Sequence, residues 1–448
     1  MPTSWTDYPA TSTTPAKALH INEVRAAINT ALGFTPNWTD GATVSNTTPI
    51  RARHFTEIRD TIQTLWRDRG LGLIPRWTSG AEPGGPSLST TATPIRASDI
   101  NDVRRWFNHY ETWGDLRGVH WFKSGMNDFP HVGWNVETVI GVSTEIDGYN
   151  EPAVQEARSY CINARNYGLV NIVRLEWKSL RAVPTNSAQY TSWRTNFNLA
   201  VENLRDVAEI FVVGNEPTVE PGMTASQYAA AFNNLFPTKV ANTLYLATGP
   251  AVWSFFGSEL DTVWLQNASD AITNLDGWAL HAYGSPYLQY AESGGTPCSA
   301  LCSTATTVCP ISCNPDPGGL TGDASFRRFR DYIDLIRAKW AAKPVYLTEM
   351  NTKGYSADTQ PNGGVPSSSY ITGWMQTAYQ EIYNFNSETN PTRSQYPRVL
   401  ALAWFVDDPR STPEWEDYAL SNTDPLKPKL QQARTDFKNS VTSTGIMT

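Results

Sequence analysis

Long apolar runs, blocks of basic residues and clustered histidines are all missing from this chain of 448 residues. No apolar run approaches the ~20 residues that a membrane-spanning helix needs, so we expect no membrane partner. The net charge is −8, only 17% of the residues are charged, and no segment is rich in lysine and arginine. This balance argues against binding to nucleic acid. The six histidines are scattered along the chain, so the sequence predicts no metal centre.

Cysteine is also scarce, and four of the five cysteines stand together. Cys161 lies in a helical pattern and is expected to be a buried free thiol. The other four fall in one loop rich in proline, glycine, serine and threonine: Cys298, Cys302, Cys309 and Cys313. We expect disulfides among them, in any of three connectivities. A zinc site with four thiolate ligands is the alternative, because three residues between two cysteines is a spacing that zinc ligands use.

The first part of the chain contains three copies of one pattern, at residues 14–25, 48–59 and 93–104. Each copy begins with a Thr-Pro pair and continues with apolar residues at helical spacing. One helix of this length cannot bury its apolar face alone, whereas three stacked copies can. We therefore predict a three-helix module over residues 1–115. It serves either for attachment and substrate targeting or as a stabilising cap.

Equivalent positions in the three copies hold His20, His54 and Asp99. Such a set could mark a metal or ligand position. The alternative is a helix-start residue that satisfies nearby backbone groups, and we favour it because the third copy breaks the pattern. A Trp-Thr pair precedes each copy, at Trp5, Trp38 and Trp77.

From residue 116 onward, short apolar runs alternate with amphipathic stretches. The runs are typical of buried parallel strands and lie at residues 118–122, 137–142, 170–177, 210–215, 244–248, 278–283, 345–349 and 399–406. The predicted helices span residues 153–167, 190–208, 225–240, 326–340, 370–385 and 430–441. Eight strands that alternate with helices predict an α/β fold, a (β/α)8 TIM barrel, over residues 116–448.

Two glutamates stand where two of these runs end. Glu216 follows the fourth run and Glu349 ends the seventh. The carboxyl ends of the strands are where α/β barrels carry their chemistry. Two carboxylates at two such ends are the minimum equipment for hydrolysis of a glycosidic bond.

The pattern from about residue 118 to the C-terminus resembles the clan A glycoside hydrolases. These are (β/α)8 retaining enzymes with one glutamate after strand four and another on strand seven. The resemblance is carried by Asn215-Glu216-Pro217, Glu349, His281-Ala282-Tyr283 at the end of the sixth run, and Trp404 on the eighth. The N-terminal repeats do not belong to this pattern.

The resemblance implies that Glu349 is the nucleophile and Glu216 the general acid/base. It also implies that Tyr283 donates a hydrogen bond to Glu349. Asn215 would bind the sugar 2-hydroxyl, and Trp404 would stack under the sugar. Glu216 has to be protonated at the working pH, so we expect its pKa to be raised towards neutrality.

Other residues near the strand ends are candidates for the same site. Glu349 needs a nearby cation to stay ionised, and Arg174 is the candidate, with pairing to Glu176 as the alternative. His281 is expected to line the floor, and Trp177 either stacks on substrate or belongs to the core. Asp407 and Asp408 are expected to cap a loop. Further subsites are predicted at Trp253, Phe255, Phe256, Tyr287 and Tyr290.

Together these features predict a retaining hydrolase that cleaves a β-linked poly- or oligosaccharide internally. A retaining mechanism requires carboxyl groups ~5–5.5 Å apart. A non-catalytic carbohydrate-binding or cell-surface protein and a transglycosylase are the alternatives. The chemistry needs no metal or organic cofactor, and we expect a monomer.

Composition favours an extracellular protein, since the 17 tryptophans and 19 tyrosines suit contact with sugar rings. The first residues contain neither a basic nor an apolar segment. We therefore expect either that a secretion signal has been removed or that the protein leaves the cell by another route.

Overall fold

The computed structural model describes most of the chain. The described residues are 5–6, 10, 17–68, 95, 97–112, 115–123, 133–167, 169–179, 181–219, 223–251, 261–283, 326, 328–351, 370, 372–387, 396–410 and 413–440. The four clustered cysteines lie outside them, as do Trp77, Trp253, Phe255, Phe256, Tyr287 and Tyr290. Disulfides or zinc among those cysteines thus stay a prediction. Within the described ranges, no helix combines the length and the apolar character needed to cross a membrane.

Eight parallel strands close into a barrel in chain order, β1 to β8, which confirms the predicted fold class. The strands are β1 (Arg117–His120), β2 (Trp134–Val139), β3 (Val170–Leu175), β4 (Ile210–Val213), β5 (Leu244–Thr248), β6 (Gly277–Tyr283), β7 (Val345–Asn351) and β8 (Val399–Trp404). The second strand begins three residues earlier than predicted, and several others end sooner.

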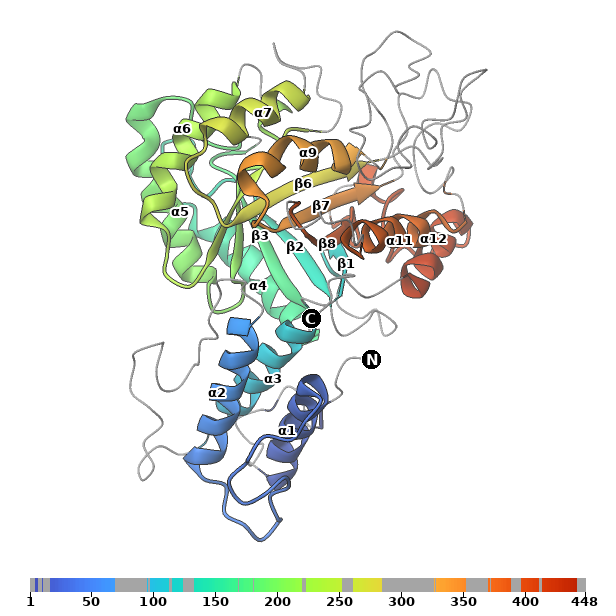
Figure 1. Ribbon diagram of the computed structural model, residues 1–448. Coiled ribbons are helices and arrows are strands. Elements are labelled where there is room, and N and C mark those ends of the chain that lie inside the picture. The colour runs from blue at the N-terminus through green and yellow to red at the C-terminus, as the bar shows by residue number, and fades with distance from the viewer. Residues whose placement is uncertain are drawn as a thin grey trace.

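Helices surround the barrel in Figure 1. They are α4 (Glu151–Tyr167), α5 (Tyr190–Leu204), α6 (Ala225–Leu235), α7 (Asp261–Ala271), α9 (Arg328–Trp340), α11 (Trp374–Ser387) and α12 (Pro428–Asn439). The sequence did not lead us to predict α7, because polar residues interrupt its apolar face. Trp264 and Leu265 nevertheless anchor this helix in the core. Cys161 of α4 is a buried free thiol, as predicted, and burial raises its pKa.

Successive strand residues face opposite sides of the barrel wall. On β3, Ile172 belongs to the cluster inside the barrel, whereas Val173 and Leu175 belong to the cluster under the helices. Arg174 follows the inward pattern of Ile172. This alternation decides which side chains can reach the mouth of the barrel.

Three helices precede the barrel: α1 (Ala18–Leu32), α2 (Ala52–Asp68) and α3 (Ala97–Thr112). Each copy of the repeat has an arginine at the same position. Each of these arginines forms an ion pair with an acidic residue of another copy, so that the three pairs close into a ring. The pairs are Arg25–Glu57 (3.0 Å), Arg59–Asp99 (2.7 Å) and Arg104–Glu23 (2.7 Å). The ring links the three helices pairwise.

The repeated histidines act at the helix starts. His20 Nδ1 accepts the backbone N–H of Lys17 at 3.3 Å, and His54 Nδ1 accepts that of Arg51 at 3.1 Å. In the third copy, Asp99 accepts a hydrogen bond from Arg59. The helix-start interpretation is therefore confirmed for both histidines.

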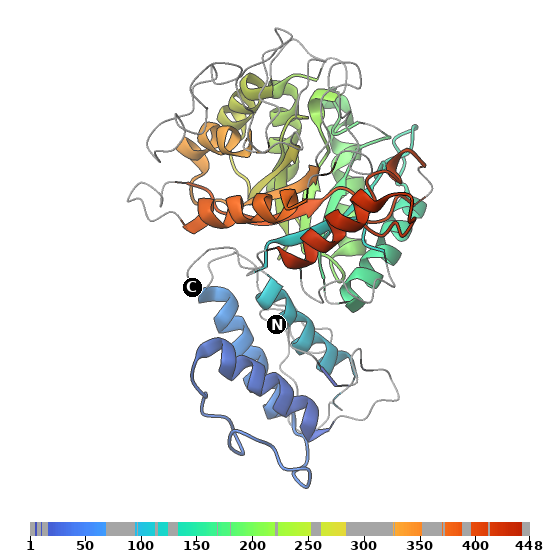
Figure 2. The same ribbon diagram turned by 90° about the vertical axis from the view of Figure 1, so that its right-hand side faces the viewer.

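The helical module lies against the amino-terminal ends of the strands (Figures 1 and 2). Trp106 of α3 belongs to one buried cluster with Trp134 and Val170, the first residues of β2 and β3. Arg105 Nη1 lies 2.8 Å from Glu209 Oε1, just before β4, and both side chains are buried. The module thus covers the end of the barrel opposite the carboxyl ends of the strands.

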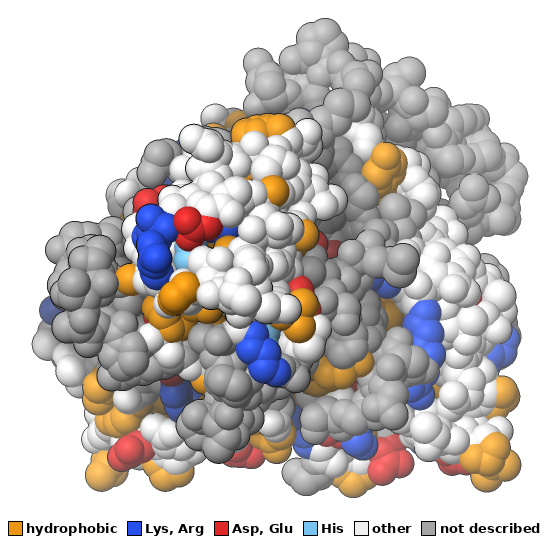
Figure 3. Space-filling model, turned by 90° about the horizontal axis from the view of Figure 1, so that it is seen from below, with side chains coloured by type: hydrophobic (Ala, Val, Ile, Leu, Met, Phe, Trp, Pro, Cys, Tyr) orange, Lys and Arg blue, Asp and Glu red, His pale blue; other side chains and the backbone are white. Residues whose placement is uncertain are grey.

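Viewed from below, charged groups of both signs lie beside each other on the described surface (Figure 3).

Candidate active site

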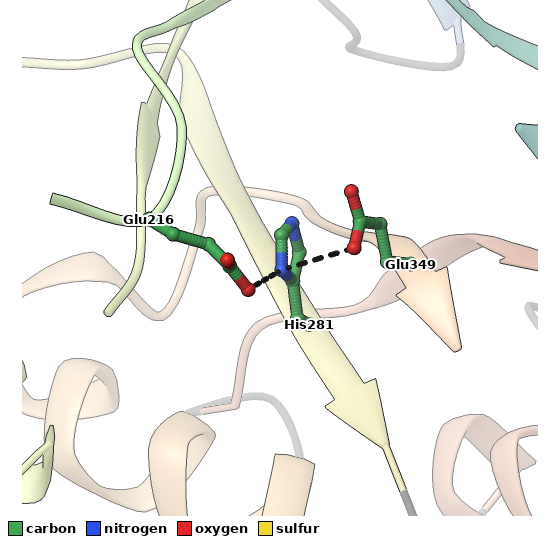
Figure 4. Close-up of side chains that lie close together, drawn as sticks. All are labelled: Glu216, His281 and Glu349. Carbon is green, nitrogen blue, oxygen red and sulfur yellow. Dashed lines mark hydrogen bonds and ion pairs between the residues drawn. The ribbon is translucent and has the colours of Figure 1, made fainter. Parts of the chain in front are cut away.

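Two carboxylates and one imidazole meet at the carboxyl ends of β4, β6 and β7 (Figure 4). His281 Nδ1 lies 2.7 Å from Glu216 Oε1 and 3.6 Å from Glu349 Oε2. One oxygen of each glutamate and the imidazole nitrogen all lie within 4.8 Å of one another. The side chains of His281 and Glu349 are 2% and 6% exposed, whereas that of Glu216 is 24% exposed. Glu216 is therefore the one most open to solvent.

A tight turn after β4 carries Glu216 to this position. Gly214 has φ +80°, and a Cβ atom there would lie 2.7 Å from the Cβ of Ala182, so only glycine fits. Glu216 itself has φ +36°, in the left-handed region. This conformation costs a non-glycine residue on the order of 1 kcal/mol and is typical of functional sites.

A bulge in β7 turns Glu349 into the barrel. Strict alternation would send Glu349 outward with Leu347, which packs under the helices. The pairing with β6 instead passes from Leu280↔Leu347 to His281↔Glu349, so Thr348 is an extra residue in β7. Such a bulge shifts the facing of the residues that follow it. Glu349 consequently faces inward, and Met350 packs outward.

Arg174 pairs with Glu349, as predicted, through Nη1 and Oε1. The hydroxyl of Tyr283 donates a hydrogen bond to the other oxygen, Oε2. Burial alone would raise the pKa of Glu349, but the charges of His281 and Arg174 and these hydrogen bonds outweigh burial and lower the pKa. Glu349 is thus held ionised.

Tyr283 and Asn215 complete the contacts around this pair. Burial, together with the charges of Glu349 and Glu216, raises the pKa of Tyr283, so its hydroxyl stays protonated and can donate. Asn215 Oδ1 accepts a hydrogen bond from Arg174 Nη1 at 3.0 Å. The amide group of Asn215 therefore lies beside the ion pair, where its NH₂ group can face a substrate.

Trp404 does not lie at the site, and its predicted stacking role is wrong. Its side chain is fully buried and packs edge-on against Tyr370 and Trp374 on the helix side of β8. Strand alternation is the reason, because Ala403 faces the barrel interior and Trp404 faces outward. The next residue, Phe405, is partly exposed, and its ring centroid lies 6.4 Å from that of Tyr283.

Trp177 is also a core residue. Its side chain is 4% exposed, it belongs to the cluster under the helices, and Lys178 Nζ lies 4.6 Å from the centre of its ring. The stacking alternative for Trp177 is therefore wrong. Among the described residues, Phe405 lies beside Tyr283, and Trp121 and Trp415 contact Phe405 and each other. Counting strands in the sequence could not show which aromatic side chains face the mouth of the barrel.

Asp407 and Asp408 cap loops, as predicted. Asp407 Oδ2 accepts the backbone N–H of Lys123 at 2.8 Å, and Asp408 Oδ1 accepts that of Arg410 at 3.0 Å. Asp407 is fully buried, and burial raises its pKa to about 7. The first bond ties the loop after β8 to the segment that follows β1, and the second lies within the loop.

Three buried polar residues near Arg174 were missed by the sequence reasoning. His120 ends β1, and Glu137 and Thr138 lie near the end of β2. Each interrupts an apolar run that is buried on both faces, and that interruption was the available signal. Glu137 pairs with Arg410, from the loop after β8, at 2.5 Å.

Glu216, His281 and Glu349 are also the group that could hold a metal ion within the described part of the chain. Both oxygens of Glu349 are already engaged, by Arg174 and Tyr283. A guanidinium charge at this distance disfavours a second cation. The contacts therefore suit proton transfer and nucleophilic attack by carboxylates better than metal binding.

No family model matches the chain, and no curated protein matches it either. Similar solved structures include a family 39 glycoside hydrolase from the gut symbiont Bacteroides cellulosilyticus WH2, at 13% identity and a TM-score of 0.45, with 73% of this chain and 64% of that chain covered. This chain thus spans less than two thirds of that protein's length.

A GH5_18 protein from Bifidobacterium longum subsp. longum matches at 14% identity and a TM-score of 0.45, with 74% and 81% of the two chains covered. The Pseudomonas stutzeri endoglucanase Cel5A matches at 14% identity and a TM-score of 0.43, with 74% and 96% covered. At such identity, function has to be inferred from the geometry of the site.

Proposed function

We propose that this protein is a glycoside hydrolase that cleaves a β-linked poly- or oligosaccharide with retention of anomeric configuration. The observation that carries the proposal is the facing pair of Glu216 and Glu349. One carboxylate oxygen of Glu216 lies within 4.8 Å of one carboxylate oxygen of Glu349. This separation supports a retaining mechanism, because inverting enzymes need ~6.5–9.5 Å between the carboxyl groups to admit a water molecule.

In the first step, an oxygen of Glu349 attacks the anomeric carbon while the bond to the leaving oxygen breaks. Arg174 and Tyr283 keep Glu349 ionised for this attack. Glu216, at the more open side, gives its proton to the leaving oxygen. The products of this step are a covalent glycosyl-enzyme ester and the leaving saccharide, which now carries a free hydroxyl group.

In the second step, Glu216 takes a proton from a water molecule, and the oxygen of that water attacks the anomeric carbon. The ester bond to Glu349 breaks, and the carboxylate returns to its ion pair with Arg174. His281 contacts both glutamates, at 2.7 Å and 3.6 Å. It can therefore hold the two carboxylates in position through the change of roles.

Internal cleavage is the mode that the aromatic surface supports. Trp415 and Phe405 are both partly exposed beside the mouth, with ring centroids 5.3 Å apart. The two rings pack edge to face, so together they offer a bound sugar chain more than one aromatic surface. A chain bound across several such positions is cut away from its ends.

The test is hydrolysis of a panel of β-glucans, β-mannans, β-xylans and β-galactans, with product sizes and the anomeric configuration of fresh products measured. We expect oligosaccharide products that keep the β configuration, and we expect Glu349→Gln to lose at least ~10³-fold in rate with its fold intact.

Each alternative has its own outcome. Products of inverted configuration would contradict the double displacement, and release of monosaccharides alone would contradict internal cleavage. Sugar binding without turnover by the wild type would favour a binding protein. Longer products on addition of an acceptor sugar, in place of hydrolysis, would favour a transglycosylase.

A further inference from the structure

Arg174 uses every donor of its guanidinium group at the site, so its orientation is fully specified. Nε donates to Thr138 Oγ1 at 3.1 Å, and Nη2 donates to the same oxygen at 3.0 Å. Nη2 also lies 2.8 Å from His120 Nε2. Nη1 donates to Asn215 Oδ1 and to Glu349 Oε1. Arginine has five such donors, and all five find acceptors here.

His120 cannot turn away from Arg174. Its ring is fully buried and contacts both Trp121 and Phe405, with centroid distances of 4.8 Å and 5.0 Å and interplanar angles of 26° and 30°. Burial and these two ring contacts restrict rotation of the imidazole. Strand β1 holds its backbone at the mouth of the barrel.

The contact also specifies where the proton of His120 lies. Arginine has no acceptor and stays charged, so the nitrogen that faces Nη2 must accept. Nε2 is thus unprotonated, and the ring is neutral with its proton on Nδ1. An imidazolium here would set one N–H against another. Burial, together with the charges of Arg174, Arg410 and His281, lowers the pKa of His120 well below its usual value.

We propose that His120 and Thr138 are positioning residues that aim Arg174 at Glu349, with His120 acting as a neutral hydrogen-bond acceptor. Its effect on catalysis rests on the proposed hydrolase function. His120 and Thr138 come from β1 and β2, whereas Glu349 comes from β7, so the guanidinium joins the two sides of the barrel mouth. Neither residue touches the reacting atoms.

The physical consequence concerns the nucleophile. Without acceptors on the far side, the guanidinium can rotate, and its Nη1 no longer stays on Glu349. Misplacement by about 1 Å in a catalytic group can cost ~10²-fold in rate. The loss should fall on kcat more than on KM, because His120 lies behind Arg174 and does not line the substrate.

The experiment compares His120→Leu with His120→Gln. Leucine fills similar space without an acceptor, whereas the Oε1 of glutamine can replace Nε2. We expect His120→Leu to lose about 10–100-fold in kcat and to shift the acid limb of the rate profile to higher pH. His120→Gln should recover at least about tenfold of that loss. Thr138→Val, a smaller change, should shift the acid limb in the same direction.

Two kinetic results would overturn the proposal: an unchanged kcat and acid limb in both His120→Leu and Thr138→Val, or equal impairment of the leucine and glutamine variants. Histidine side-chain ¹⁵N spectra test the proton position directly, with the His120 signal assigned from its loss in His120→Gln. Protonated Nε2 at pH 6 would also overturn it. This spectrum stays decisive if the wild type hydrolyses no glycoside, which would refute the proposed function alone.

Discussion

Arg174 and Glu349 form an ion pair across the barrel mouth, from β3 to β7, and their side chains are only 4% and 6% exposed. Each charge would be costly to bury alone. Together they keep a carboxylate ionised inside the protein, because the guanidinium opposes the effect of burial on the pKa of Glu349. The ion pair therefore has two effects: each charge compensates the burial of the other, and Glu349 stays ionised.

Replacement of Arg174 by lysine should weaken the ion pair with Glu349. Lysine is a point charge and cannot make the five hydrogen bonds of Arg174. We expect Arg174→Lys to lose about 10–100-fold in kcat/KM. The acid limb of the pH profile should move to higher pH, because the pKa of Glu349 rises when its cation is less well placed. Arg194→Lys, on the outer helix α5, is the matched control, and equal profiles for both variants would contradict the expectation.

Glu216 can be tested through the leaving group. A substrate with a poor leaving group needs a proton from Glu216, so Glu216→Ala should slow its cleavage by about 10²–10⁴-fold. An aryl glycoside with a good leaving group needs no such proton for the first step, so formation of the covalent intermediate should change little. Pre-steady-state release of the aryl group measures this step. Glu176→Gln is the control, because Glu176 is another buried carboxylate just after β3. The same dependence on the leaving group in that variant would reject the assignment of Glu216.

The contact between the helical module and the barrel contributes to stability. Arg105 and Glu209 are 8% and 2% exposed, and loss of one partner leaves the other charge buried. Arg105→Leu should reduce the free energy of unfolding by about 3–5 kcal/mol, measured by urea denaturation. The double variant with Glu209→Leu should recover a large part of this loss. Additive effects of the two changes would show that the pair does not couple module and barrel.

Asp407 should make the stability depend on pH. Its pKa is about 7 in the folded protein, against ~3.9 in an unfolded chain. The folded state thus binds a proton that the unfolded state has lost between those values, so stability falls as pH rises through that window. Because asparagine cannot ionise, Asp407→Asn should gain stability relative to wild type by about 1.4 kcal/mol per pH unit between pH 5 and 7. Unfolding at several pH values measures this difference. The exposed Asp270 provides the control variant, Asp270→Asn, and a constant difference for Asp407→Asn would contradict the expectation.

Much of the fold could be predicted because its signals are local. Each strand is a short apolar run, and Glu216 and Glu349 stand at the ends of two of them, so counting runs was enough to assign both to one face of a barrel. Helix α7 was missed because polar residues interrupt its apolar face, and its burial depends on the neighbours that it packs against.

Side-chain facing was harder to predict, because it depends on register. Trp404 and Phe405 are neighbours in sequence, and the resemblance favoured the tryptophan as the residue at the site. A shift of one residue reverses the facing of every side chain, and the structure places Phe405 near Tyr283 and Trp404 under α11. No local pattern distinguishes the two.

The sequence by itself determined the order of eight strands, the three helical repeats and the two glutamates at strand ends, because these depend on the spacing of residues along one segment. Only the tertiary structure decided that Glu349 faces inward, since that requires Thr348 to be an extra residue of β7 in its pairing with β6. It alone brought His120 and Thr138 to Arg174, since strands β1, β2 and β3 meet through barrel closure and register. Contacts between distant segments follow from packing, which no single stretch of sequence contains.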